Sequence, residues 1–183
     1  MSFPQNQSYS SEDYWKLPDG DRAELIGGKL YSMAPPNFLH QNLLMEISGT
    51  IREYVKSHGG TCEVVPAPFA VNLDAEDRDW VEPDISVVCD KRKLDDRGCS
   101  GAPDWVIEIV SPSSRKHDYS TKNALYTEAG VREYWIVDPA KERVTVYYYE
   151  EDAAPSLYTF DMTVTCGIFP DLKISVAELL KEP

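Results

Sequence analysis

The sequence predicts an α/β domain in which a mixed β-sheet is flanked by helices and preceded by an N-terminal β-hairpin. Residues 105–137 follow the order strand, helix, strand, which is typical of a crossover between parallel strands. Residues 39–55 carry apolar side chains three and four positions apart, the spacing of one buried helix face. Gly27 and Gly28 separate two strand-like runs, and this pair favours a tight hairpin turn.

The chain has 183 residues, of which 42% are hydrophobic and 27% are charged, as in an ordinary globular protein. No Pro/Gly-rich linker divides it, so we expect one domain over residues 10–183 after a disordered or frayed start at residues 1–9. No apolar run reaches the roughly 18 residues of a membrane span, and the polar start lacks the features of a secretory signal.

The four cysteines are scattered along the chain without a CxxC pair. This pattern argues against a zinc site or a disulfide framework and favours reduced thiols in a cytoplasmic protein. The cysteines are Cys62, Cys89, Cys99 and Cys166.

The elements are expected in the following order. Ser10 or Ser11 caps a short helix, because acidic residues follow in its first turn, and this helix ends near Pro18, Asp19 and Gly20. The hairpin spans 22–33, and the long helix spans 39–55 before Gly59-Gly60. Runs rich in β-forming residues then follow at 62–73, 85–89, 105–110, 133–137 and 143–149. A second helix begins near Asp118 or Ser120 and ends at Gly130, and the tail adds a strand from 156 and a short helix at 176–180.

The net charge of −13 argues against broad non-specific binding to nucleic acid, because phosphates require a basic surface. The charge is uneven, however. Residues 91–122 hold seven basic and five acidic side chains, a local charge of +2, which leaves −15 for the remainder. The basic segments 91–97 and 115–116 could hold backbone phosphates or could simply aid solubility.

Glu108 is the one carboxylate in the apolar strand 105–110. A buried carboxylate without a partner loses several kcal/mol of solvation or takes up a proton, so it needs a cation, a metal or hydrogen-bond donors. A core salt bridge to Arg115 or Lys122, or an exposed strand face, would satisfy it as well as a metal would.

Asp84 follows Pro83 and opens the preceding strand. If the strands of Asp84 and Glu108 are neighbours, the two carboxylates meet at one end of the sheet. Like charges this close favour a divalent cation between them, and hard oxygen ligands suit Mg²⁺ or Mn²⁺. An Asx-type turn after Pro83 is the structural alternative for Asp84.

Lys122 lies on the helix that follows the Glu108 strand. Its ammonium could reach the acids and orient or activate water, or it could pair with Asp118 on a solvated helix surface.

These residues, taken in order, resemble the putative restriction endonuclease (Uma-two) family of the PD-(D/E)XK nuclease superfamily. The resemblance rests on Pro83-Asp84, on Glu108 to Ser113, on Asp118 with Lys122 and Tyr126, and on Gly130 to Pro139. Glu24-Leu25-Ile26 with Gly27 is similar to the early hairpin of the family, and His40 to a residue before its long helix. The similarity spans about residues 10–180.

The resemblance implies a restriction-endonuclease-like core and a metal-dependent endonuclease that hydrolyses phosphodiester bonds of nucleic acid, with DNA as the first candidate. Asp84 and Glu108 would hold Mg²⁺, with Mn²⁺ as the alternative, and Lys122 would assist hydrolysis. The superfamily pattern places a lysine two residues after the acid, where this chain has Val110, so Lys122 replaces it from the next helix. Glu24 is a further acid that could reach the metal, and His40 is a weaker candidate.

A homodimer with two sites is the simplest arrangement for cutting two strands. The competing hypothesis is a catalytically inactive nuclease-fold dimer that acts as a DNA-binding or protein-interaction module, and the acidity of the chain favours it. A serine hydrolase is disfavoured because Ser111 to Ser114 lack the glycines of a nucleophile elbow.

Overall fold

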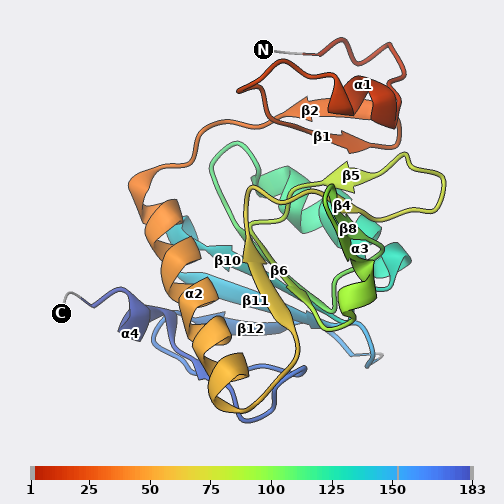
Figure 1. Ribbon diagram of the computed structural model, residues 1–183. Helices are drawn as coiled ribbons and strands as arrows, with labels where there is room; N and C mark the ends of the chain where they lie inside the picture. The colour runs from red at the N-terminus through yellow and green to blue at the C-terminus, as the bar shows by residue number, and fades with distance from the viewer. Residues whose placement is uncertain (1–2, 152, 182–183) are drawn as a thin grey trace.

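The computed structural model describes residues 3–151 and 153–181 and contains two six-stranded sheets (Figure 1). The main sheet has the order β12-β11-β10-β9-β6-β3. Its strands are β3 (Glu63–Pro66), β6 (Ile85–Val88), β9 (Trp105–Ile109), β10 (Glu133–Asp138), β11 (Arg143–Tyr148) and β12 (Ser156–Thr159).

The main sheet is mixed, as predicted. β9 and β10 are parallel, and their connection contains η2, a π-helical segment (His117–Lys122), and helix α3 (Asn123–Ala129). β6 pairs with β9 antiparallel, and β11 pairs with β10 antiparallel. Gly130 ends α3 with φ 86°, a left-handed conformation that glycine adopts without a steric cost.

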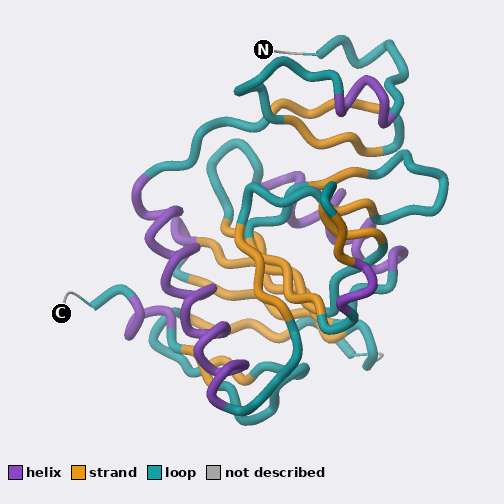
Figure 2. Tube along the Cα trace, viewed as in Figure 1, coloured by secondary structure: helices purple, strands orange, loops and turns teal. Residues whose placement is uncertain are grey.

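Helices cover both faces of this sheet (Figure 2). Helix α2 (Phe38–Ser57) packs the buried side chains Leu43, Ile47 and Ile51 on one face, confirming the predicted amphipathic helix. The other face is covered by α3, whose Tyr126 is fully buried against that side of the sheet. Each face therefore has a hydrophobic core of its own.

The second sheet has the order β2-β1-β5-β4-β8-β7 and contains the predicted hairpin. In the hairpin, β1 (Ala23–Ile26) and β2 (Lys29–Ser32) are joined by Gly27 and Gly28, whose φ angles are 55° and 75°. The other strands are only two or three residues long, too short for a periodic signal, and most were not predicted. They are β4 (Val71–Asn72), β5 (Trp80–Val81), β7 (Leu94–Asp95) and β8 (Gly98–Ser100), with the 3₁₀ turn η1 (Lys91–Lys93) before β7.

The predicted cap of the first helix is confirmed, because Ser10 and Asp13 form a capping box at the start of α1 (Ser11–Trp15). Residues 1–2 of the expected frayed start lie outside the described residues. Within 3–9, Gln5 donates to the Leu30 carbonyl and the Tyr9 amide donates to the Gly28 carbonyl. The described part of this segment therefore lies against the hairpin.

The tail contains the predicted short helix and a small hairpin that the sequence did not predict. A small hairpin of β13 (Val164–Thr165) and β14 (Lys173–Ile174) packs on the α2 face, followed by α4 (Val176–Leu179). Glu133 at the start of β10 is buried and accepts hydrogen bonds from the Trp135 indole and the Ile168 amide, which anchors this tail to the sheet. The short turn η3 (Pro139–Lys141) joins β10 to β11.

The expectation that all four cysteines are reduced is wrong for two of them, because Cys62 and Cys89 form a disulfide. β3 and β6 pair with Glu63 opposite Val88, so continuing the register by one residue places the two cysteines opposite each other. They are 27 positions apart in sequence, and only the pairing of the strands brings them together. Cys99 and Cys166 are free and buried.

Among the described helices, none combines the length and the hydrophobicity that crossing a membrane would require.

Candidate active site at the edge of the main sheet

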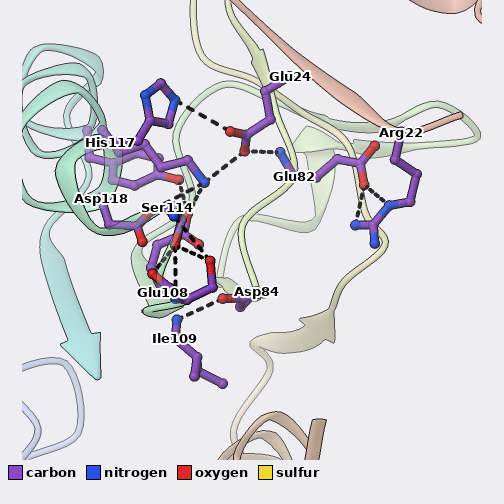
Figure 3. Close-up of polar contacts among 12 residues, drawn as sticks. Arg22, Glu24, Glu82, Asp84, Glu108, Ile109, Ser114, His117 and Asp118 are labelled. Atoms are coloured by element: carbon purple, nitrogen blue, oxygen red, sulfur yellow. Dashed lines mark hydrogen bonds and ion pairs between the residues drawn. The ribbon is translucent and has the colours of Figure 1, made fainter. Parts of the chain in front are cut away.

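Glu108 is buried on β9, with 3% of its surface exposed, on the side of the sheet that η2 and α3 cover. Its Oε1 atom accepts a hydrogen bond of 2.8 Å from the ammonium of Lys122 and one of 2.6 Å from the hydroxyl of Tyr126. The carboxylate is therefore held from the helical side of the crossover, at the end of a buried strand (Figure 3).

Lys122 is the last residue of the π-helical turn and is also buried, with 4% of its surface exposed. Its ammonium lies 2.8 Å from Oε1 of Glu108, 2.8 Å from Oε1 of Glu24 and 3.9 Å from Oδ1 of Asp118. The solvated surface lysine considered above is not what the structure shows. Asp118, Lys122 and Tyr126 are spaced four residues apart, which aligns them on one side of the helical segment.

Glu24 reaches the cluster from the hairpin. It is buried on β1, accepts a hydrogen bond of 3.0 Å from the Glu82 amide, and lies with Oε2 3.7 Å from Nε2 of His117. The second sheet thus contributes a carboxylate to a site that otherwise belongs to the main sheet and its crossover.

Asp84 lies immediately before β6. Ile85 pairs with Ile107, so one further step of the antiparallel register sets Asp84 opposite Glu108. Its Oδ2 atom accepts a hydrogen bond of 2.7 Å from the Ile109 amide and lies 3.2 Å from Nε2 of His40, near the start of α2. The predicted neighbourhood of the two strands is confirmed.

The electrostatics of the cluster reflect burial and crowding. Burial raises the pKa of Glu108 well above its ordinary value, and Asp84, Asp118 and Glu24 add to this rise while Lys122 opposes it. Burial also raises the pKa of Asp118 to about 6. For Lys122 burial disfavours the charge, but the nearby carboxylates outweigh it and raise the pKa above its ordinary value.

Asp84 and Glu108 have the chemistry that a hard divalent cation requires. Within residues 3–151 and 153–181, no three His, Cys, Asp or Glu side chains are arranged as a ready metal site. The described hydrogen bonds, however, engage only Oε1 of Glu108 and Oδ2 of Asp84. The carboxylates of Glu24, Glu108 and Asp118 lie 2.8–3.9 Å from the Lys122 ammonium, and Asp84 stands opposite Glu108. This excess of negative charge is the environment in which Mg²⁺ or Mn²⁺ binds. The residues present fit the ion that the family resemblance implies.

Residues 91–93, one of the two basic segments considered for phosphate contacts, lie beyond the end of β6 opposite to Asp84. Lys91 pairs with Glu63, Arg92 pairs with Asp90, and Lys93 donates to the Ala102 carbonyl. That part of the segment is therefore distant from the cluster and satisfied elsewhere. Arg115 and Lys116 lie in the loop after β9, at the same edge of the sheet as Glu108.

Tyr126 and His117 also lie in the site, and neither was predicted as a site residue. Tyr126 could have been found from its spacing, because it follows Lys122 by four residues on one helix. No sequence pattern indicated the contact of His117 with Glu24, because it joins the crossover to a hairpin that is distant in sequence. His40 was treated as a weak candidate, and the structure places it beside Asp84.

Comparison with known proteins gives the family of this chain. The family model "Uma2: Putative restriction endonuclease" matches residues 11–177. The chain belongs to the Uma2 family. The family name describes restriction endonucleases, so nuclease chemistry is the activity class that this membership supports.

Two similar proteins extend the comparison. The uncharacterized protein slr1290 of Synechocystis sp. is 24% identical over 146 residues, which are 78% of this chain and 75% of the relative. A crystal structure titled as a "putative nuclease belonging to DUF820" from Anabaena variabilis superposes with a TM-score of 0.77 at 23% identity, covering 93% of this chain and 96% of that one. This second match shows that the Uma2 chain shares the fold of that protein.

Proposed function

We propose that this Uma2 protein is a metal-dependent endonuclease that hydrolyses phosphodiester bonds of DNA. The observation that carries the proposal is the position of Glu108, buried on β9, held by Lys122 and set opposite Asp84 by the strand register. Membership of a family described as restriction endonucleases supports the same chemistry.

In this proposal Asp84 and Glu108 hold Mg²⁺ or Mn²⁺. A cation bound there would polarise a phosphoryl oxygen and lower the pKa of its water.

The residues of the chain prepare the site in three ways. The Tyr126 hydroxyl and the Ile109 amide each fix one carboxylate, so that Glu108 and Asp84 keep their positions. The Lys122 ammonium places a positive charge beside Glu108, where it can stabilise negative charge that develops on the phosphate. Glu24 completes the shell around Lys122 and is a candidate for a further metal contact.

The alternative is an inactive nuclease-fold dimer that acts as a DNA-binding or protein-interaction module. Two observations favour it: the chain carries a net charge of −13, and the Lys122 ammonium occupies the centre of the acidic cluster. A module of this kind has no need for paired Asp84 and Glu108.

Cleavage of plasmid and of short single- and double-stranded DNA in Mg²⁺ or Mn²⁺ separates the two functions. We expect metal-dependent cleavage that Asp84→Asn and Glu108→Gln each abolish. Glu63→Gln is the matched control, because Glu63 is an exposed acid at the far end of the same sheet. No cleavage with either metal on any of these substrates would support the module.

Metal binding can be followed without activity. We expect Mg²⁺ or Mn²⁺ to raise the thermal stability of the native protein and of Glu63→Gln, and to leave that of Glu108→Ala unchanged. A flat response of the native protein would contradict the metal-dependent proposal.

We further propose a homodimer with one site per protomer, acting in the cytoplasm, since two sites related by a two-fold axis would cut both strands. The size of the protein in solution tests the dimer. Reduced cysteines were one reason to expect a cytoplasmic location, and the Cys62–Cys89 disulfide weakens that reason. The thiol state of the protein isolated from its own cells tests the location.

A further inference from the structure

A shallow hollow lined by basic and hydroxyl side chains lies in the loops that follow β9 and β10. Three of its side chains are positively charged, and the chain as a whole carries −13. The lining residues are Pro112, Ser113, Arg115, Lys116, Tyr119 and Lys141. A positive hollow on an acidic protein is a local feature that requires an explanation.

Asp138 beneath this hollow fixes one of the three cations. It is fully buried and accepts hydrogen bonds from Nη1 and Nη2 of Arg115, with Tyr119 also within 3.4 Å. The bidentate pair holds the guanidinium plane in one orientation and largely neutralises it.

The net charge of the hollow therefore comes from Lys116 and Lys141. Both side chains are exposed, and neither takes part in an ion pair among the described residues. The hollow thus offers two uncompensated ammonium groups beside an anchored guanidinium.

The hollow and the acidic cluster lie at the same edge and on the same face of the main sheet. β9 and β10 are parallel, and Glu108 pairs with Ile136. Asp138 therefore lies on the strand next to that of Glu108, two residues after the position opposite Glu108. From strand spacing and rise, the backbones at Glu108 and Asp138 are about 8 Å apart. Alternation of side chains places Glu108, Ile136 and Asp138 on the face that α3 covers.

One loop connects the two features. Residues 110–117 leave β9 just after Glu108, contribute Arg115 and Lys116 to the hollow, and return to the cluster at His117, beside Glu24. A polymer bound at the acidic cluster would therefore have its next anionic group within reach of the hollow.

We propose that this hollow binds a backbone phosphate next to the bond that the cluster cleaves, with Lys116 and Lys141 as the ion-pair partners and Arg115 positioned by Asp138. This inference rests on the proposed function, because it assigns the neighbouring contact of the same substrate. The ligand is a nucleic-acid phosphate, since Lys and Arg at a site of this kind contact the backbone and position it without reading sequence.

The test is the salt dependence of binding, measured by fluorescence anisotropy with fluorescein-labelled 20-nucleotide DNA, single-stranded and duplex, in EDTA. We expect Lys116→Gln/Lys141→Gln to lower the slope of log K against log salt by about 1.8 on duplex and about 1.4 on single strands, because two counterion-releasing contacts are lost. The matched control is Lys56→Gln/Lys173→Gln, which removes two exposed lysines on the α2 face of the sheet and should leave the slope unchanged.

Two results would overturn the inference. The first is an equal slope for the hollow variant and the control variant. The second is an equal loss of binding to poly-glutamate of similar charge, which would make the hollow a general anion site without a preference for phosphate.

Cleavage assays on the same proteins separate this inference from the proposed function. Native cleavage together with an unchanged slope in the hollow variant would reject the hollow and retain the nuclease. A reduced slope without cleavage by the native protein would retain the hollow as a nucleic-acid contact and reject the nuclease.

Discussion

The ammonium of Lys122 and the carboxylate of Glu108 are 2.8 Å apart, and both side chains are almost completely removed from solvent. They come from the two consecutive elements of one crossover, the strand β9 and the helical segment that follows it. A buried pair of this kind stabilises a fold only while both partners are present, because either charge alone would be desolvated without compensation.

Replacement of Lys122 by Met should therefore destabilise the protein by roughly 3–5 kcal/mol, since Glu108 and Glu24 would be left buried without their cation. Urea unfolding of the native and variant proteins measures this change. Lys173→Met, at an exposed position on β14, is the control and should stay within about 0.5 kcal/mol of the native value. If Lys122→Met lowered the free energy of unfolding by less than about 1 kcal/mol, the Lys122–Glu108 pair would not be important for the stability of the fold.

Tyr126→Phe should lower the rate of DNA cleavage and cost roughly 1.5–3 kcal/mol of stability, because Glu108 loses its 2.6 Å hydrogen bond from a buried hydroxyl. Steady-state cleavage and urea unfolding together give both effects. Tyr147→Phe is the matched control, since Tyr147 belongs to the same aromatic cluster and is only partly buried. Equal behaviour of the two variants would argue against a positioning role for Tyr126.

Reduction of the Cys62–Cys89 disulfide should lower the free energy of unfolding by about 3.5 kcal/mol, the loop-entropy value for a sequence separation of 27. Unfolding with and without dithiothreitol measures the effect, and thiol titration of the denatured protein reports the bond. Cys62→Ser/Cys89→Ser should be insensitive to the reductant. Four free thiols in protein purified without reductant would contradict the disulfide.

Glu133 should make stability depend on pH. Burial raises the pKa of its carboxyl in the folded protein, although the Ile168 amide and the Trp135 indole oppose this rise. The folded state then holds the proton more tightly than the unfolded state, so the contribution of Glu133 is greatest below its ordinary pKa and declines as pH rises through the raised value. We expect the free energy of unfolding of the native protein to fall relative to that of Glu133→Gln as the pH rises from 4 to 8. A constant difference across this range would contradict the raised pKa.

The elements that the sequence predicted are those with strong local signals. Helix α2 has a regular apolar face, the hairpin has Gly27-Gly28 at its turn, and β9 and β10 consist mainly of apolar, β-forming residues. Two-residue strands such as β4 and β5 carry no such signal. They exist because neighbouring backbone pairs with them, and that pairing depends on the whole fold.

The candidate site likewise contains residues that the sequence predicted and contacts that only the structure shows. Residue type and spacing singled out Asp84, Glu108 and Lys122, because a carboxylate in an apolar strand must have a partner. The contact of His40 with Asp84 and that of His117 with Glu24 join segments far apart in the chain, so no local pattern could reveal them.

The amino-acid order alone determined which groups carry charge and which segments become helix or long strand, because these depend on side-chain chemistry and near neighbours. Only the tertiary structure decided that Lys122 turns inward between Glu24 and Glu108, and that Cys62 meets Cys89. The physical reason is burial: a lysine on a helix gains a fixed partner only when strands from two sheets close around it and exclude water.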